Sequence, residues 1–156
     1  MPEWWSKNSP SMFAYMDGGV WIHDVQADYC KFFGIQRGIE NRVYSFQGNN
    51  MIKLYEAIAL HSNQQLDLDE IYVYTDETND KYMLSKIPDS WWTKIEGVYR
   101  SPYLRNMLSK GSSSNVDLMN GDFLRGYVIE NRFTKDEVTT ELNIFSSEIV
   151  TDKSNI

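Results

Sequence analysis

The chain has 156 residues, the length of one domain, with 15 basic against 22 acidic residues and a formal net charge of −7. Hydrophobic residues make up 42% of it, charged residues 24% and aromatic residues 14%, which excludes a disordered chain, a collagen-like chain and a coiled coil. No apolar run reaches the roughly 18 residues of a membrane-spanning helix, and the acidity argues against nonspecific binding to nucleic acid, because the average surface repels phosphates.

The first predicted element is a β-hairpin near the N-terminus. Asp17-Gly18-Gly19 separates two largely apolar stretches, residues 12–16 and 20–23. Glycine accepts the positive φ angle that tight hairpin turns need, so this spacing predicts two antiparallel strands. Residues 27–33 follow as a weaker candidate for a short helix.

Alternating hydrophobic residues then predict strands in the middle of the chain. Residues 42–46 and 51–61 are joined by a Gln-Gly-Asn-Asn turn, and in the second run Glu56 interrupts the alternation. A run rich in tyrosine and β-branched residues, 71–75, precedes an acidic turn at 76–80. We expect each of these runs to form a strand.

One further helix is predicted at residues 101–111. Ser101 can cap it, Pro102 suits its first turn and Gly111 suits its end. Its apolar residues recur at helical spacing, and a polar, flexible stretch follows at 111–115.

The last predicted elements are two strands, residues 123–133 and 138–144, which both alternate with a period of two. Thr134-Lys135-Asp136-Glu137 separates them, so we expect an antiparallel hairpin. The chain after Val150 is polar and is expected to be loose.

Taken together, these elements predict an all-β fold. We expect an antiparallel β-sandwich, of jelly-roll or immunoglobulin-like type, with one or two short helices and an N-terminal β-hairpin. The expected organisation is a hairpin segment at 1–38, a β-sandwich domain at 39–150 and a flexible tail at 151–156.

Residues for catalysis or metal binding are scarce. The chain has one cysteine, Cys30, which excludes an intramolecular disulfide, and two histidines, His23 and His61, in no known nucleophile or zinc pattern. The acidic run at 67–70 lacks the glycine and distal glutamate of a calcium loop. We therefore expect a non-enzymatic protein with no catalytic residue, cofactor or metal.

The aromatic residues are better candidates for function. Trp4-Trp5 and Trp91-Trp92 are adjacent pairs, and adjacent residues on a strand point to opposite faces, so each pair is expected to place one ring outside a one-sided core. Such rings suit a protein interface, a sugar site or the core of a two-layer sandwich, and Gly126 suits the close approach of a neighbouring backbone. The residues predicted to form an interface are Trp4, Trp5, Trp21, Tyr72, Tyr74, Trp91, Trp92, Tyr99, Tyr103, Gly126 and Tyr127.

Two passages resemble a known family. The first is SMFAYMDGGVWIHD at 11–24, followed by YCKFFG at 29–34; the second is KIEGVYR at 94–100, followed by NGDFLRGYV at 120–128. In this order they are similar to passages of tailed-bacteriophage virion proteins, namely nozzle, muzzle or tail-stabilisation components of short-tailed phages, including the crAss-like group. The resemblance covers residues 4–60 and 90–150.

The resemblance implies a non-enzymatic structural component of a phage virion, made in the host cytoplasm, that assembles into the tail, nozzle or portal-proximal complex. Its implied partners are tail, portal or adaptor subunits and further copies in a ring, with DNA passing without specific binding and with no membrane anchor. The resembling proteins are much larger, so the chain matches their C-terminal part, and residues 1–38 can be interpreted as the remnant of a propeller blade.

A second interpretation stays open. A carbohydrate-binding β-sandwich module, part of a receptor-binding protein or adhesin, would use Trp91, Trp92 and the tyrosines as platforms for sugar rings.

Overall fold

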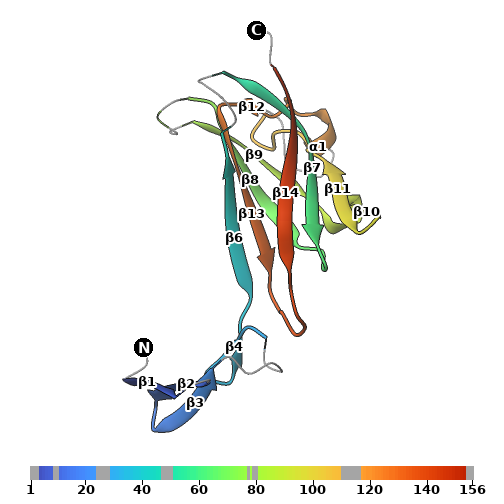
Figure 1. Ribbon diagram of the computed structural model, residues 1–156. Helices are drawn as coiled ribbons and strands as arrows, with labels where there is room; N and C mark the ends of the chain where they lie inside the picture. Colours follow the sequence, from blue (N-terminus) through green and yellow to red (C-terminus); the bar gives the residue numbers. More distant parts are fainter. Residues whose placement is uncertain are drawn as a thin grey trace. The chain divides into compact units, whose positions relative to one another are not determined.

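The computed structural model describes residues 4–8, 11–23, 29–46, 51–76, 78, 81–109 and 117–153. Nearly all regular structure among them is β-strand (Figure 1), which confirms the predicted all-β class. The chain divides into two compact units. One consists of Met1–Ile39 with Lys135–Glu141, and the other of Glu40–Thr134 with Leu142–Ile156.

The smaller unit contains the predicted N-terminal hairpin. Strands β2 (Ser11–Met16) and β3 (Gly19–His23) pair antiparallel, and β1 (Trp4–Asn8) adds a third strand beside β2. The turn places Asp17 at φ 53° and Gly18 at φ 73°, the two positive angles of a type I′ turn. The hairpin is therefore confirmed, within a three-stranded sheet.

The predicted helix at 27–33 is wrong where the structure describes it. Residues 29–30 form a turn and β4 (Lys31–Phe32) pairs with β5 (Ile35–Gln36); residues 27–28 lie outside the described residues. Phe33 and Gly34 adopt φ angles of 50° and 75° between the two strands, so this segment closes as a second tight hairpin.

The predicted strand at 138–144 is also wrong, because residues 136–143 form a loop. The side chain of Val138 is buried, and its carbonyl accepts a 2.7 Å hydrogen bond from Nε2 of Gln36. Val138 and Gln36 both belong to the smaller unit. Packing within that unit therefore outweighs the strand tendency of the alternating sequence.

The larger unit is built from two antiparallel sheets. In the first, the β7 sheet, the central strand β7 pairs with β14 along one edge and with β11 and β12 along the other, and β10 follows β11. The second, the β8 sheet, has the order β6-β13-β8-β9. The strands are β6 (Ile39–Ser45), β7 (Lys53–Ser62), β8 (Asp67–Tyr74), β9 (Tyr82–Ile87), β10 (Thr93–Ile95), β11 (Val98–Pro102), β12 (Arg125–Gly126), β13 (Val128–Lys135) and β14 (Ile144–Lys153).

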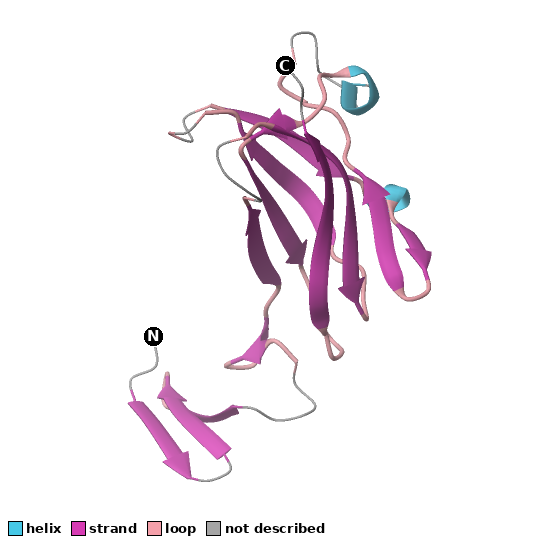
Figure 2. Ribbon diagram, turned by 45° about the horizontal axis from the view of Figure 1, so that its top comes forward, coloured by secondary structure: helices cyan, strands magenta, loops and turns pink. Residues whose placement is uncertain are grey.

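The two sheets lie face to face as the layers of a β-sandwich (Figures 1 and 2). Ile58 and Leu60 of the β7 sheet and Ile71, Val73 and Ile129 of the β8 sheet each keep 1% or less of their surface exposed. This core confirms the predicted sandwich.

Two β-bulges change which residues face the core. Val150 pairs with Ala57 and Thr151 with Tyr55, so Glu56 is an extra residue in β7, at the interruption seen in the sequence. In β8 the register shifts between Asp67 and Glu70 relative to β13, and between Leu68 and Ile71 relative to β9. Leu68 and Ile71 are both fully buried as a result, and the acidic residues between them are exposed.

The predicted helix at 101–111 is wrong over its described part. Strand β11 ends at Pro102, and residues 103–109 are irregular. The backbone amide of Tyr103 donates to the carbonyl of Glu56 at 2.8 Å. This hydrogen bond ties the segment after β11 to the β7 bulge, so the amide is not available to a helix. Helical turns occur instead at η1 (Asp89–Trp91) and α1 (Asp117–Asn120).

The predicted C-terminal hairpin and tail both need correction. Strands β13 and β14 belong to different sheets, because β13 pairs with β8 and β14 with β7. Strand β14 continues to Lys153, which pairs with Lys53. Residues 151–153 are thus part of the sandwich, and residues 154–156 lie outside the described residues.

Candidate functional site

Three of the predicted interface side chains are buried in the sandwich. Trp92 and Tyr99 are each 9% exposed and Tyr103 is 8% exposed. The hydroxyl of Tyr103 donates to Oδ1 of Asn131 at 3.1 Å. Little of these three side chains is therefore exposed on this chain, and their role in an interface stays a prediction.

The prediction for Trp91 and Trp92 assumed that the pair lies on a strand. The structure places it at a helical turn instead. Trp91 belongs to the η1 turn and is half-buried, whereas Trp92 follows the turn and is buried. One ring of the pair still reaches the surface, but the turn, rather than strand alternation, is the cause.

Gly126 is required by the chain's own backbone. A Cβ atom there would lie 2.3 Å from the carbonyl oxygen of Tyr74 and 2.7 Å from Cγ1 of Val73. The chain crosses from the β7 sheet to the β8 sheet at this point, and the next amide, of Tyr127, donates to the same carbonyl at 2.9 Å. The close neighbour predicted for Gly126 is therefore part of the same molecule.

The predicted aromatic residues of the smaller unit differ in exposure. Trp4 is 66% exposed, with its ring 5.4 Å from that of Tyr15. Trp21 is half-buried, lies 5.9 Å from the ring of Phe33 and contacts the turn at Gly34. The side chain of Trp5 lies outside the described residues.

Tyr72 and Tyr74 belong to a group of four tyrosines on the outer face of the β8 sheet. Tyr74 pairs with Tyr82 across β8 and β9, and the rings of Tyr72 and Tyr82 lie 5.2 Å apart. Tyr44 and Tyr82 are 51% and 45% exposed. We call this surface, made of Tyr44, Tyr72, Tyr74 and Tyr82, the tyrosine face. The remaining predicted residue, Tyr127, is half-buried.

A buried carboxylate supports the tyrosine face. Glu130 of β13 is 1% exposed and accepts hydrogen bonds of 2.7 Å from the hydroxyl of Tyr74 and from Nε of Arg132. Arg132 also pairs with Glu70, and its guanidinium lies 4.5 Å from the centre of the Tyr72 ring. The ring positions are thus held by a network of charged hydrogen bonds.

Two members of this network, Glu130 and Tyr74, have pKa values shifted away from neutral pH. Burial acts to raise the pKa of Glu130, but hydrogen bonds from Arg132, Tyr74 and Tyr44 outweigh it, and the net effect holds this pKa below its usual value. Burial and the nearby Glu130 raise the pKa of Tyr74 to about 12. The face therefore offers fixed hydrogen-bonding groups and aromatic rings, which suit binding.

A charged groove of about 230 Å³ borders the network, lined by Glu40, Arg42, Asp69, Glu70, Arg132 and Thr134. Sequence reasoning missed these residues. The alternation of Glu130, Arg132 and Thr134 along one strand places them on one face and could have identified the β13 part of the groove. Asp69 and Glu70 are adjacent and both exposed because of the β8 bulge. No alternation in the sequence indicates this.

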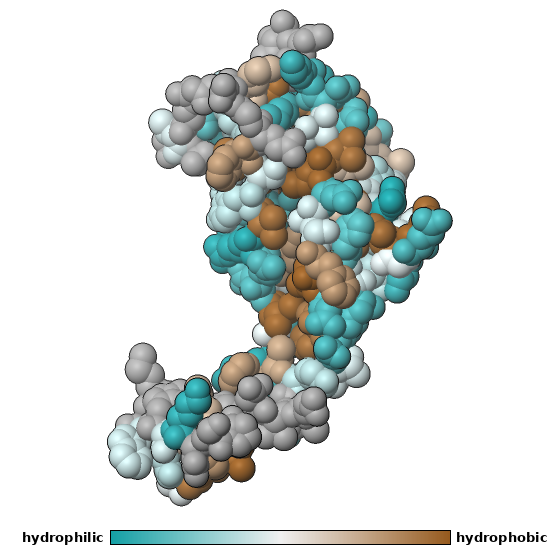
Figure 3. Space-filling model, in the orientation of Figure 1, coloured by the Kyte–Doolittle hydropathy of each residue, from teal (hydrophilic) through white to brown (hydrophobic). Residues whose placement is uncertain are grey.

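A second exposed surface follows strand β14, which we call the β14 edge. Within the described part of the chain β14 pairs only with β7, which leaves one side of a ten-residue strand without a neighbour. Phe145 and Val150 on this strand are 73% and 52% exposed. Figure 3 shows hydrophobic residues distributed among hydrophilic ones along this side of the sandwich.

Among the described residues, no three His, Cys, Asp or Glu side chains are grouped so that they could hold a metal ion. No described helix is long and apolar enough to cross a membrane. Searches with family models and against curated proteins give no match to this chain.

Proposed function

We propose that this protein is a non-enzymatic structural component of a tailed-phage virion, which assembles with further copies of itself and with other tail or portal-proximal subunits. The proposal combines the resemblance of residues 4–60 and 90–150 to such proteins with the β-sandwich fold.

The β14 edge is the observation that carries the assembly part of the proposal. A long edge strand presents unpaired backbone groups and is a template for pairing with another chain. Natural edges are commonly shortened, covered or protected by charge. The edge of β9 follows this pattern, because the amide of Met107 donates to the carbonyl of Leu84 at 2.7 Å. Strand β14 is long and, among the described strands, pairs only with β7. It exposes Phe145 and Val150 beside the charged Glu148, Asp152 and Lys153, and these apolar side chains suit assembly.

The test is the oligomeric state of the purified chain, measured by light scattering after size exclusion and by electron microscopy. We expect a concentration-dependent closed oligomer. Val150→Lys places a charge on the β14 edge and should shift the equilibrium to monomer. A strictly monomeric protein at its highest soluble concentration would contradict self-assembly.

Leu108→Lys is the matched control. Leu108 is 55% exposed, close to the 52% of Val150, but lies in the irregular segment after β11. This variant should assemble as the wild type does. Equal loss of assembly in both variants would point to a general effect of charge rather than to β14.

The tyrosine face favours a second candidate function, a carbohydrate-binding module. Exposed aromatic rings stack on sugar rings, and the carboxylates and guanidinium groups of the adjacent groove can bind hydroxyls. Binding of bacterial surface polysaccharide by a monomer, followed by intrinsic fluorescence, would support it. Tyr82→Ala should then reduce binding, whereas Trp4→Ala, an exposed ring in the other unit, should not.

A further inference from the structure

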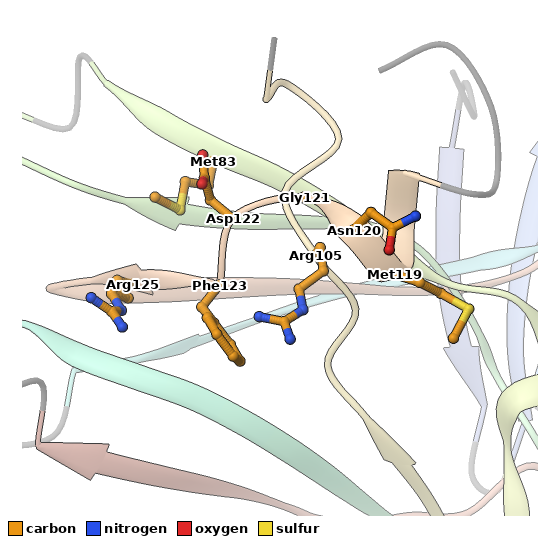
Figure 4. A pocket seen from close by; sticks show the side chains of 8 residues that line it. All are labelled: Met83, Arg105, Met119, Asn120, Gly121, Asp122, Phe123 and Arg125. Carbon is orange, nitrogen blue, oxygen red and sulfur yellow. The ribbon is translucent and has the colours of Figure 1, made fainter. Parts of the chain in front are cut away.

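A second pocket lies outside both surfaces described above. It has a volume of about 670 Å³ and is formed by Met83 of β9, Arg105 of the irregular segment, residues 119–123 and Arg125 of β12. Figure 4 shows Arg105, Phe123 and Arg125 together in this pocket.

Two arginines share one aromatic ring in this pocket. The guanidinium carbon of Arg105 lies 3.2 Å from the centre of the Phe123 ring, and that of Arg125 lies 5.9 Å from the same point. The two carbons are therefore no more than 9.1 Å apart. This concentrates positive charge on a chain whose net charge is −7.

Neither guanidinium has a carboxylate partner within the described part of the chain. Arg42 and Arg132 of the same unit each pair with a glutamate. The one carboxylate that lines the pocket, Asp122, is engaged elsewhere, since Oδ2 accepts a 3.0 Å hydrogen bond from the hydroxyl of Ser109. Asp122 keeps its negative charge, but neither arginine is paired with it, so the lining carries one positive charge in excess.

The backbone that carries the two arginines is fixed. Asn106, next to Arg105, is buried, and its Oδ1 accepts from the amides of Leu84 at 3.1 Å and Leu108 at 3.0 Å. The backbone amide of Asn106 donates to the carbonyl of Asp122 at 2.9 Å. Arg125 pairs with Leu54 in the β7 sheet. A site on such a backbone loses little entropy when a ligand binds.

We propose that this pocket binds an oxyanion, a carboxylate or a phosphate, carried on an apolar or ring-shaped body. A guanidinium is a planar fork of donors that matches both anions, and two of them around one pocket can hold a single charged group. Phe123 and Met119, which are 50% and 60% exposed, supply apolar contact for the rest of the ligand. This site is independent of the β14 edge and of the tyrosine face.

The test is a nuclear magnetic resonance titration of the full chain with phenyl phosphate, benzoate and neutral benzyl alcohol. We expect saturable shifts of the Nε–Hε signals of Arg105 and Arg125 with at least one of the two anions and no saturable shift with the alcohol. The stronger anion distinguishes a phosphate from a carboxylate site. Absence of saturable binding by both anions would overturn the proposal.

Variants localise the binding. Arg105→Gln and Arg125→Gln should each weaken it at least tenfold, while Arg100→Gln, an exposed arginine on β11, should leave it unchanged. The amide spectrum of each variant checks the fold. Equal weakening by all three variants would show a general charge effect and would also overturn the proposal.

Discussion

At Gly126 the fold depends on the absence of a side chain. Gly126→Ala would place a Cβ atom 2.3 Å from the backbone oxygen of Tyr74, and backbone cannot move aside as a flexible side chain can. We expect a loss of about 1–3 kcal/mol in the free energy of unfolding, as for other overpacked sites. Urea titration followed by circular dichroism measures it.

The control for this substitution is Gly97→Asn. Gly97 has a φ angle of 83°, and a Cβ atom there would have nothing within 4 Å. Asparagine tolerates this left-handed region better than most residues, so the loss should stay below about 1 kcal/mol. If Gly126→Ala is no more destabilising than Gly97→Asn, the crossing at Tyr74 is looser than the structure indicates.

Glu130 predicts a pH dependence of stability. Its pKa is lower in the folded than in the unfolded chain, so its stabilising contribution is present above the usual glutamate pKa of about 4.3 and is lost as pH falls through the folded pKa. Glu130→Gln should cost about 2 kcal/mol at neutral pH, because a buried charged hydrogen-bond network is broken.

The difference between this variant and the wild type should shrink on acidification, since protonation of Glu130 removes the same interactions. Urea unfolding from pH 7 down to pH 3 follows it. The exposed Glu137→Gln variant should run parallel to the wild type across this range. A constant gap between Glu130→Gln and the wild type would contradict the assigned direction of the pKa shift.

Single residues also show what could be predicted from the sequence. Tyr72 and Tyr74 were identified as surface aromatics, and both lie on the tyrosine face. Tyr99 and Tyr103 were predicted to be interface residues for the same reason, as tyrosines in an aromatic-rich chain, but both are buried. What separates them is the face on which each lies. That depends on strand register and on the β7 bulge, neither of which a count of aromatic residues contains.

At the level of elements, turn chemistry was a partial guide, because the turn signal at 134–137 predicted a hairpin that does not form. The Asp-Gly-Gly hairpin and the strand before the acidic turn at 76–80 were both predicted. Errors arose where local pattern and tertiary contacts disagreed, as at residues 101–111 and 138–144. In both segments a backbone group forms a hydrogen bond with a residue more than forty positions away: the amide of Tyr103 with Glu56, and the carbonyl of Val138 with Gln36.

The bulge in β8 makes a prediction about one deletion. Leu68 pairs with Ile87 and Ile71 with Ser85, so β8 has one residue more than β9 over this stretch. Deleting Asp69 would make the ladder regular and keep both Leu68 and Ile71 facing the core. The variant should fold cooperatively in a thermal melt.

Deleting Tyr72 is the contrasting variant. It removes a residue from a regular part of β8, so the residues on one side of the deletion must change face. Val73, which is fully buried, or Ile71 would then point outward, and we expect no cooperative unfolding. Equal behaviour of the two deletions would mean that the register of β8 is weakly specified.

The charge of the whole molecule bears on its assembly. A net charge of −7 on every copy opposes association. If the chain forms the proposed oligomer, apolar contacts at β14 must outweigh this repulsion, and the oligomer should strengthen as salt screens the charges. Assembly that weakens with salt would instead indicate that opposite charges dominate the contact.

The two units make different contributions to the stability of the molecule. Of the buried hydrophobic residues that the structure describes, only Ala14 and Val138 belong to the smaller unit, and the rest lie in the sandwich. Residues 39–156 should therefore fold without the N-terminal segment. We expect cooperative thermal unfolding within about 5 °C of the full chain, which corresponds to about 1 kcal/mol.

A fragment of residues 39–143 is the control, because it also lacks β14. That strand pairs along the whole length of β7, from Lys53 to Ser62, and without it the central strand would lose one ladder. This fragment should show no cooperative transition in the same thermal melt. If residues 39–156 fail to fold as well, the small unit contributes to the sandwich core through more than its own few buried residues, and the predicted independence of the β-sandwich is wrong.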